Sequence, residues 1–213
     1  MYLPTEEMYQ YLRDEIPFRI IDVLPPGCKI QNLEKENEMD LTLLYVGGIG
    51  EQYQIHKILE VVSKMKRIKF LLCCRQTEWE KEKIEYEQYL TNNIEIHHKS
   101  GKELELLYRR ADIGMVYFKP DFYREFAMPY KVFEYLGHGI PIISSTCTAA
   151  GKFVEEEKIG WTINYDSKEL EKLLLILTTS SDEILQKSAR CREILKKNTW
   201  EERAKKVQMD LSK

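Results

Sequence analysis

The sequence predicts an α/β fold, a doubly wound parallel sheet of Rossmann-like type. Two observations lead to this prediction. From residue 40 onward, short apolar segments alternate with longer helix-forming segments, so that six strands are each followed by helical sequence. The strand segments are apolar and rich in β-branched residues, which is typical of strands that helices cover on both faces. Sheets of this kind bind ligands at the carboxyl ends of their strands, near the point where the strand order reverses.

The first 38 residues differ from this pattern. "TEEMYQYLRDEI" (5–16) predicts a short helix with a threonine cap and acidic residues in its first turn. "FRIIDVL" (18–24) predicts a strand, which prolines and a glycine stop. The polar segment 31–40 predicts a linker or an exposed loop. We therefore expect two parts, residues 1–38 and a larger domain over 39–213.

Within the larger domain, each element follows from apolar periodicity and from turn-forming residues between segments. The strands expected in the parallel sheet are 41–46, 68–73, 94–98, 113–117 and 140–144, with a further strand at 160–165. The helices expected between and after them are 52–66, 78–90, 101–110, 129–137, 167–178, 181–197 and 199–211, and 119–127 is expected to be a loop. Binding chemistry is expected in the loops that follow the strands.

Composition excludes several classes of function. The net charge of −3 provides no general attraction to nucleic acid. No apolar run approaches the roughly 20 residues of a membrane-spanning helix, and no signal peptide begins the sequence, so a cytoplasmic location is expected. The five cysteines include no C-x-x-C pair, and no Asp-x-Asp occurs, so neither a zinc site nor another metal site is predicted.

The most informative stretch is "AMPYKVFEYLGHGIPII" (127–143). Pro129 is expected in the first turn of a helix, whose N–H groups then form an anion site at the edge of the sheet. Lys131 can add a positive charge for a phosphate, and Glu134 lies three residues later on the same face. A carboxylate there can accept hydrogen bonds from two vicinal hydroxyls of a ribose. Gly139 is expected to end the helix in the left-handed conformation.

A simpler interpretation of the same residues is an exposed salt bridge between Lys131 and Glu134 on an ordinary amphipathic helix. The position of the helix, directly after the carboxyl end of a strand in a doubly wound sheet, favours the binding site.

Several segments resemble a known family. "LLYVGGIG", "ELELLYRRADIGMVYF", "MPYKVFEYLGHGIPIISS" and "NTWEERAKKV" are similar to the donor-binding C-terminal half of two-domain GT-B glycosyltransferases, of the family 4 type that builds bacterial surface polysaccharides. The resemblance covers about 40–213. It implies the transfer of a sugar from a nucleoside-diphosphate sugar, such as a UDP-sugar or a GDP-sugar, to a glycan or lipid-linked acceptor. It implies no metal and no other cofactor.

The resemblance also assigns roles to individual positions. Glu134 is expected to bind the donor ribose, and Ala127, Met128, Pro129, Tyr130 and Lys131 to hold the pyrophosphate at the start of the helix. Gly47 and Gly48 form the glycine loop that passes close to the phosphates or the sugar. Backbone near His97 and His98 is expected to face the base.

The sequence departs from the family pattern at two places. Many relatives carry two glutamates eight residues apart, whereas Glu125 lies nine residues before Glu134, so Glu125 is a site candidate without an assigned role. Many relatives also have a basic pair after the glycine loop, where this chain has Gln54. Neutralisation of the phosphates is therefore expected from Lys131, Arg75 or Arg124.

Residues 1–30 also resemble a part of this family, the last strand of the N-terminal acceptor domain and the turn after it. We expect the chain to need such a domain, or a partner chain, for transfer, and no residue is assigned a catalytic role. The strand 18–24 is expected to be docked on the domain or exchanged in a homodimer through 1–30. A membrane-proximal acceptor would place the protein at the inner membrane periphery. Two other functions remain open, a non-catalytic nucleotide-binding half that works with a partner chain, and a sugar-nucleotide epimerase.

Overall fold

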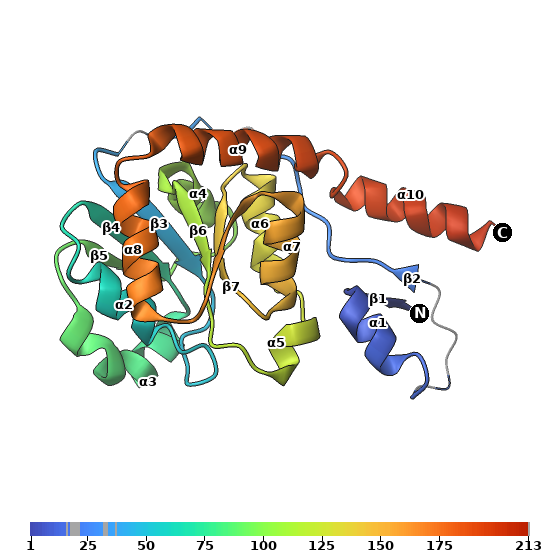
Figure 1. The fold of residues 1–213 in the computed structure, drawn as a ribbon, viewed down its shortest axis with the longest axis horizontal. Coiled ribbons are helices and arrows are strands. Elements are labelled where there is room, and N and C mark those ends of the chain that lie inside the picture. The colour runs from blue at the N-terminus through green and yellow to red at the C-terminus, as the bar shows by residue number, and fades with distance from the viewer. Residues whose placement is uncertain (16, 18–21, 32–33, 37, 213) are drawn as a thin grey trace.

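The computed structural model describes residues 1–15, 17, 22–31, 34–36 and 38–212. In this part of the chain, the main sheet has six strands in the order β5-β4-β3-β6-β7-β8, and every neighbouring pair is parallel (Figure 1). The strands are β3 (Leu41–Val46), β4 (Ile68–Cys73), β5 (Ile94–His97), β6 (Ile113–Val116), β7 (Ile142–Ser145) and β8 (Gly160–Ile163). The predicted doubly wound parallel sheet is confirmed. Its strand order reverses between β3 and β6.

Helices cover both faces of the sheet (Figure 1). After β3 the helices are α2 (His56–Val62), α3 (Gln76–Tyr86), α4 (Glu105–Arg110), α5 (Phe122–Phe126), α6 (Tyr130–Gly137), α7 (Ala149–Glu157), α8 (Ser167–Leu177), α9 (Ser181–Leu195) and α10 (Trp200–Leu211), and the last of them extends beyond the sheet. Short 3-10 turns at Glu87–Tyr89 and Gly101–Leu104 complete the predicted helices 78–90 and 101–110. The helices and strands therefore alternate as the apolar pattern predicts.

Two predicted segments were wrong in detail. The helix expected at 52–66 begins only at His56, because the chain before it forms a turn in which Gln54 has a φ of +46°. The loop expected at 119–127 contains α5, which Asp121 caps by accepting a hydrogen bond of 2.9 Å from the Arg124 N–H. Five residues are too few to show a helical period, so periodicity could not reveal this helix.

The N-terminal residues form a small β-α-β unit, made of β1 (Tyr2–Leu3), α1 (Glu6–Leu12) and β2 (Asp22–Val23). As predicted, Thr5 caps the helix, with its hydroxyl accepting a hydrogen bond of 3.2 Å from the Met8 N–H. The predicted strand 18–24 lies mostly outside the described residues. Its described end pairs in parallel with β1, and the linker segment 31–40 has neither helix nor strand in its described residues.

Helix α10 packs beside this N-terminal unit, at the end of the molecule where both termini lie (Figure 1). The Tyr2 hydroxyl donates a hydrogen bond of 3.1 Å to Asp210, and Lys206 forms an ion pair with Asp22. The guanidinium of Arg203 donates hydrogen bonds to the carbonyl oxygens of the two prolines at 25 and 26. The described part of the N-terminal unit is therefore docked on α10, whereas most of the strand 18–24 for which docking or exchange was predicted lies outside the described residues.

The buried side chain of Tyr135 connects α6 to the sheet. The Tyr135 hydroxyl donates a hydrogen bond of 3.0 Å to the Leu44 carbonyl and accepts one of 3.2 Å from the Val46 N–H. Its ring crosses β6 at Gly114, where a Cβ atom would lie 2.5 Å from the ring. Because these bonds hold the ring in place, α6 keeps a fixed position against β3, the strand that leads into the glycine loop.

This close approach makes Gly114→Ala destabilising. The added methyl group would displace a fully buried ring, and overpacking of this kind costs about 1–3 kcal/mol. Chemical denaturation would measure the loss. The matched control is Gly50→Ala, where a Cβ atom would have its nearest neighbour at 3.7 Å. Equal unfolding free energies for the two variants would contradict this account of the packing.

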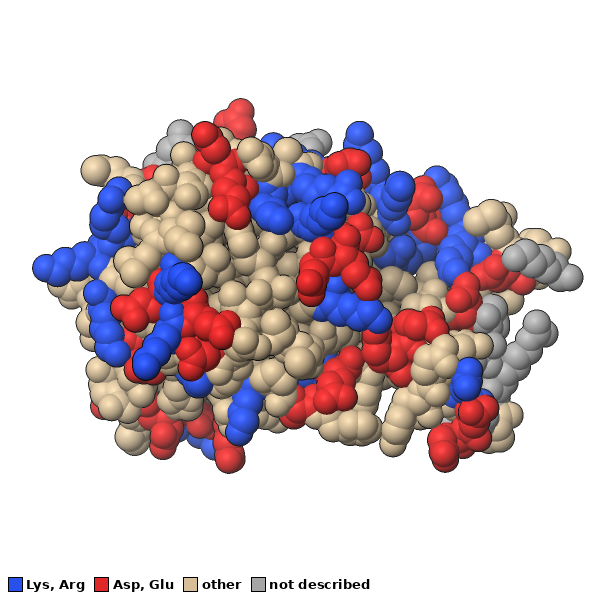
Figure 2. Space-filling view, in the orientation of Figure 1, with Lys and Arg blue, Asp and Glu red and all other residues tan. Residues whose placement is uncertain are grey.

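Acidic and basic side chains are interspersed over the face shown in Figure 2, and lysine and arginine are most frequent over α9 and α10. Among the helices of the described residues, none is both long enough and apolar enough to cross a membrane.

Candidate functional site

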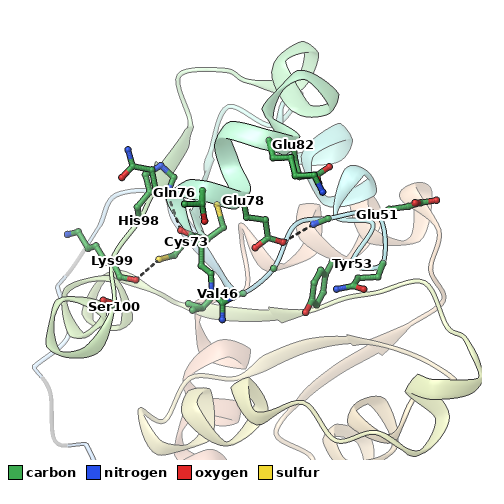
Figure 3. Close-up of a pocket in the computed structure, with 18 of the residues that line it drawn as sticks. Val46, Glu51, Tyr53, Cys73, Gln76, Glu78, Glu82, His98, Lys99 and Ser100 are labelled. Atoms are coloured by element: carbon green, nitrogen blue, oxygen red, sulfur yellow. Dashed lines mark hydrogen bonds and ion pairs between the residues drawn. The ribbon is translucent and has the colours of Figure 1, made fainter.

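A cavity of about 1440 Å³ opens at the carboxyl ends of β3, β4 and β5. Its walls come mainly from three loops, residues 46–54, 73–78 and 98–100. Figure 3 shows His98, Lys99 and Ser100 on one side of the cavity, Glu51 and Tyr53 on the other, and Glu78 between them. The cavity therefore lies where a doubly wound sheet places its ligand.

The glycine loop after β3 is held from several directions. The Glu78 carboxylate accepts hydrogen bonds of 2.8 Å and 3.1 Å from the N–H groups of Ile49 and Gly50. The Tyr45 hydroxyl donates a hydrogen bond of 2.5 Å to the Gly48 carbonyl, and the Tyr86 hydroxyl donates one to the Ile49 carbonyl. These contacts give the loop a fixed shape, which is the property that a binding wall needs.

Both predicted glycines of this loop are required by their surroundings. Gly47 has a φ of +147°, which side chains other than glycine rarely adopt. A Cβ atom at Gly48 would lie 2.2 Å from the ring of Tyr53, so only glycine fits beneath that ring. The absence of a side chain at each glycine therefore lets Lys131 and Tyr53 pack directly against the loop backbone.

Two other predicted residues line the same cavity. Arg75 is exposed at the start of α3 and forms no ion pair with any residue that the structure describes. His98 is exposed at the end of β5, and its Nδ1 lies 3.0 Å from the Cys74 carbonyl oxygen (Figure 3). The structure thus brings Gly47, Gly48, Arg75 and His98 together in the wall of one cavity.

The side chain of Lys131 extends from α6 to the backbone of the glycine loop. Its ammonium nitrogen lies 2.6 Å from the position of a Cβ atom on Gly47, 3.8 Å from the ring centre of Tyr45 and 5.0 Å from that of Phe118. This nitrogen is buried and has no hydrogen-bond partner among the described residues. Burial lowers the pKa of Lys131 to about 7, despite the opposite effect of the nearby Glu134 carboxylate.

Glu134 is half-buried one turn further along α6. Burial raises the pKa of its carboxyl group, while the Tyr108 hydroxyl, His138 and Lys131 act in the opposite direction. No salt bridge joins Lys131 to Glu134 in the described structure. The interpretation of this pair as an exposed salt bridge on an ordinary helix is therefore wrong, because the lysine nitrogen is inside the molecule. Glu134 does not line the main cavity itself.

The start of α6 differs from the prediction by one residue. Pro129 is the residue before the helix, with an extended ψ of 131°, instead of lying in the first turn. Among the described residues, no side chain caps this helix start, so its first N–H groups are available to an anion. The helix ends as predicted, because Gly139 has a φ of +66° and the Ile140 N–H bonds back to the Tyr135 carbonyl at 2.9 Å.

The remaining predicted residues do not point their side chains into the main cavity. Ala127 is half-buried beside the helix start, and Met128 lines a separate cavity of about 190 Å³ next to residues 4–7. Tyr130 stacks on Trp200 of α10, with ring centres 6.3 Å apart. Glu125 is exposed on α5. Of these residues, Met128 and Tyr130 can contribute to an anion site through the backbone next to the start of α6, whereas Glu125 belongs to α5.

Sequence reasoning missed the residues that brace the site. Glu78, Tyr45 and Tyr53 shape the glycine loop, and only the position of Glu78 in the first turn of a helix after a strand could have suggested a role. Three buried polar atoms have no hydrogen-bond partner in the described part of the chain: Tyr108 Oη, Arg124 Nε and Lys131 Nζ. The guanidinium carbon of Arg124 and the ammonium nitrogen of Lys131 lie 4.4 Å and 5.0 Å from the ring centre of Phe118.

Across the described residues, no group of three or more histidine, cysteine, aspartate or glutamate side chains could hold a metal ion.

Comparison with solved structures identifies the fold. Sucrose-phosphate synthase from Thermosynechococcus elongatus superposes with a TM-score of 0.79 at 18% identity, covering 98% of this chain and 56% of that one. Anabaena HepE in complex with UDP and glucose gives 0.79 at 13%, covering 99% and 62%. A trehalose-phosphate synthase (UDP-forming) from Burkholderia vietnamiensis gives 0.73 at 13%, covering 99% and 61%. This chain is similar to these proteins in fold, that of GT-B glycosyltransferases.

The chain spans only about 56–62% of the length of these three structures. No curated protein sequence matches it. The family model described as Glycosyl transferases group 1 matches residues 40–180, which include β3 to β8 and all the loops that surround the cavity. The chain therefore belongs to the glycosyl transferases group 1 family.

Proposed function

We propose that this chain is the donor-binding half of a glycosyltransferase that uses a nucleoside-diphosphate sugar. The observation that carries the proposal is the buried, unpartnered ammonium nitrogen of Lys131 directly beneath the glycine loop. Buried polar groups in proteins are almost always hydrogen-bonded, so an unpaired one beside a cavity indicates a site for an absent partner. A diphosphate is an anion of suitable size and charge for this place, next to an uncapped helix start.

The other parts of the donor would occupy the surroundings of this anion site. Glu134, one helical turn from Lys131, would accept hydrogen bonds from the ribose hydroxyls, and the backbone near His98 would face the base. Arg75 is an exposed cation in the cavity wall and can approach the phosphates. HepE, which has a similar fold, was solved with UDP and with UDP-glucose, and this supports a nucleotide sugar as the ligand class.

The chemistry then follows from charge. When the bond between the anomeric carbon and the diphosphate breaks, negative charge develops on the leaving diphosphate. Lys131 and the N–H groups at the start of α6 would stabilise that charge, as donors do in an oxyanion hole. We expect donor binding to need no metal ion, because these groups already supply positive charge.

The acceptor is expected to bind to a second domain or to a partner chain, since the chain spans little more than half of its two-domain relatives. We propose a glycan or lipid-linked acceptor in bacterial surface polysaccharide synthesis, in the cytoplasm or at the inner membrane surface. Residues 1–38 would be the part that contacts this domain, and self-association through 1–30 is the alternative.

A thermal-shift panel tests the donor site. UDP, GDP, ADP and CMP are compared at equal concentration, with uridine, guanosine and inorganic pyrophosphate as controls. A nucleoside diphosphate that binds only the folded chain raises its melting temperature. We expect at least one diphosphate to stabilise the chain more than its nucleoside does. If no nucleotide shifts the melting temperature, a donor-binding role for this chain is excluded.

A further inference from the structure

Helix α5 lies between the N-terminal unit and the glycine loop, and it touches both. On one side, Tyr11 of α1 packs against Phe122 and Phe126, with ring centres 5.4 Å and 5.9 Å apart. The buried hydroxyl of Thr5 donates a hydrogen bond of 2.6 Å to the Phe126 carbonyl. Figure 1 shows α1 and α5 side by side, away from the helices that surround β5.

On its other side, α5 carries Arg124 toward the cavity wall. The guanidinium lies 4.4 Å from the ring centre of Phe118 and 5.9 Å from that of Tyr53, and its Nη2 donates a hydrogen bond to the Gln52 carbonyl. Gln52 and Tyr53 both line the cavity. Arg124 is therefore a direct connection between α5 and the glycine-loop wall.

Helix α5 is held by its neighbours, packing against α7 as well as α1. The helix has five residues, none of them buried, and Phe122 and Tyr123 are 59% and 65% exposed. A helix of this length is unstable by itself and needs packing against other elements. The aromatic contact with Tyr11 and the hydrogen bond from Thr5 supply the part of that packing that comes from α1.

We propose that α1 positions the glycine-loop wall of the cavity through α5 and Arg124, so that residues outside the site set its affinity for a nucleoside diphosphate. Tyr11 and Arg124 are then positioning residues. The statement about affinity rests on the proposed function, whereas the mechanical link between α1 and the loop does not. The segment that is expected to contact a second domain would thereby be joined to the donor site.

The first part of the test uses no ligand. Amide hydrogen exchange of residues 48–54 is measured by mass spectrometry in the full chain, for the wild type, Tyr11→Ala, Tyr11→Phe and Arg124→Met. We expect faster exchange in Tyr11→Ala and in Arg124→Met, because each loosens the wall. Tyr11→Phe keeps the ring and should match the wild type. Exchange in Tyr11→Ala equal to that of the wild type would overturn the link.

The second part measures affinity by calorimetry with UDP and GDP, and with uridine and guanosine as matched nucleosides. Tyr11→Ala should weaken diphosphate binding by about three- to tenfold, the scale of coupling between contacting groups, and leave nucleoside binding unchanged. In the Arg124→Met background, Tyr11→Ala should cause no further loss. Equal losses for diphosphate and nucleoside, or additive losses in the double variant, would overturn the route through Arg124.

The two parts separate this link from the proposed function. If the exchange rates respond as expected but the wild type binds neither diphosphate, the link stands and the donor-binding role fails. If the wild type binds a diphosphate and Tyr11→Ala changes neither exchange nor affinity, the donor-binding role stands and the link is overturned.

Discussion

Replacing Glu134 by alanine is expected to weaken nucleoside-diphosphate binding by at least about tenfold, because hydrogen bonds to a charged group contribute about 1.5–3 kcal/mol each. The substitution removes the carboxylate that would accept both ribose hydroxyls. Binding of the bare nucleoside should fall as well, since the ribose is common to both ligands. Glu134→Gln keeps the shape and should lose less. Calorimetric titration with UDP and uridine, and with GDP and guanosine, measures these differences.

The matched control is Glu155→Ala, which removes the same charge from an exposed position on α7. It should bind like the wild type. Each variant must also unfold near the wild-type temperature, because the Glu134 carboxylate faces the buried Tyr108 and His138. If a diphosphate that binds the wild type binds Glu134→Ala equally well, Glu134 has no part in donor binding.

Because the pKa of Glu134 is raised, we expect the affinity for the nucleoside to depend on pH. A carboxyl group accepts two hydroxyl hydrogen bonds best when it is ionised, and burial extends its protonated form to higher pH than usual. Affinity for the nucleoside should therefore fall as the pH is lowered through the acidic range. Glu134→Gln should lack this fall. Nucleoside titrations of the two proteins at several acidic pH values, above the onset of unfolding, would detect the difference.

The sheet could be predicted from sequence because its strands are local apolar segments. Strands 41–46 and 68–73 have the predicted bounds, and the others differ by one or two residues at their ends. The cavity wall could be predicted for the same reason. Gly47, Gly48, Arg75 and His98 directly follow strands, and parallel strands bring their carboxyl ends to one edge.

The burial of Lys131 could not be predicted, because it depends on contacts between distant parts of the chain. Its environment combines Tyr45 at the end of β3 and Gly47 just after it with Phe118 after β6, and only the folded sheet brings them together. Helix α5 escaped prediction for a related reason, since its packing partner is Tyr11. The local sequence pattern therefore predicts where the site lies. The burial of its charged groups depends on the three-dimensional packing and cannot be predicted from that pattern.

Lys131→Met is expected to remove a pH dependence of stability that the wild type shows near neutrality. The folded-state pKa of Lys131 is lowered to about 7, whereas an unfolded lysine titrates near 10.4. Between these values the unfolded chain binds one more proton than the folded chain, so the unfolding free energy rises with pH. From pH 7 to pH 8 the rise due to this group is about 1 kcal/mol.

Charged and titratable groups around Lys131 come from each neighbouring element, namely Glu134 on its own helix, Arg124 on α5 and Tyr45 on β3. The measurement is urea denaturation of wild type and Lys131→Met at pH 7 and pH 8. The measurements stop at pH 8 because most thiols of the unfolded chain ionise only above it. The buried Cys28, Cys74 and Cys191 have raised pKa values in the folded protein, so ionisation of these thiols in the unfolded chain would lower the unfolding free energy at higher pH. Subtracting the two proteins cancels the titrations that they share.

The same lysine should couple diphosphate binding to proton uptake. A phosphate beside the ammonium group favours its charged form, so a protein that is partly deprotonated at pH 7 to 8 takes up a proton as UDP or GDP binds. Calorimetry in two buffers with different ionisation enthalpies measures that proton directly. Lys131→Met should bind the diphosphate more weakly and show a smaller uptake, while its affinity for the bare nucleoside stays near the wild-type value. A wild-type slope of stability with pH that persists unchanged in Lys131→Met would show that this lysine is fully charged in the folded protein, and the proton coupling would be lost with it.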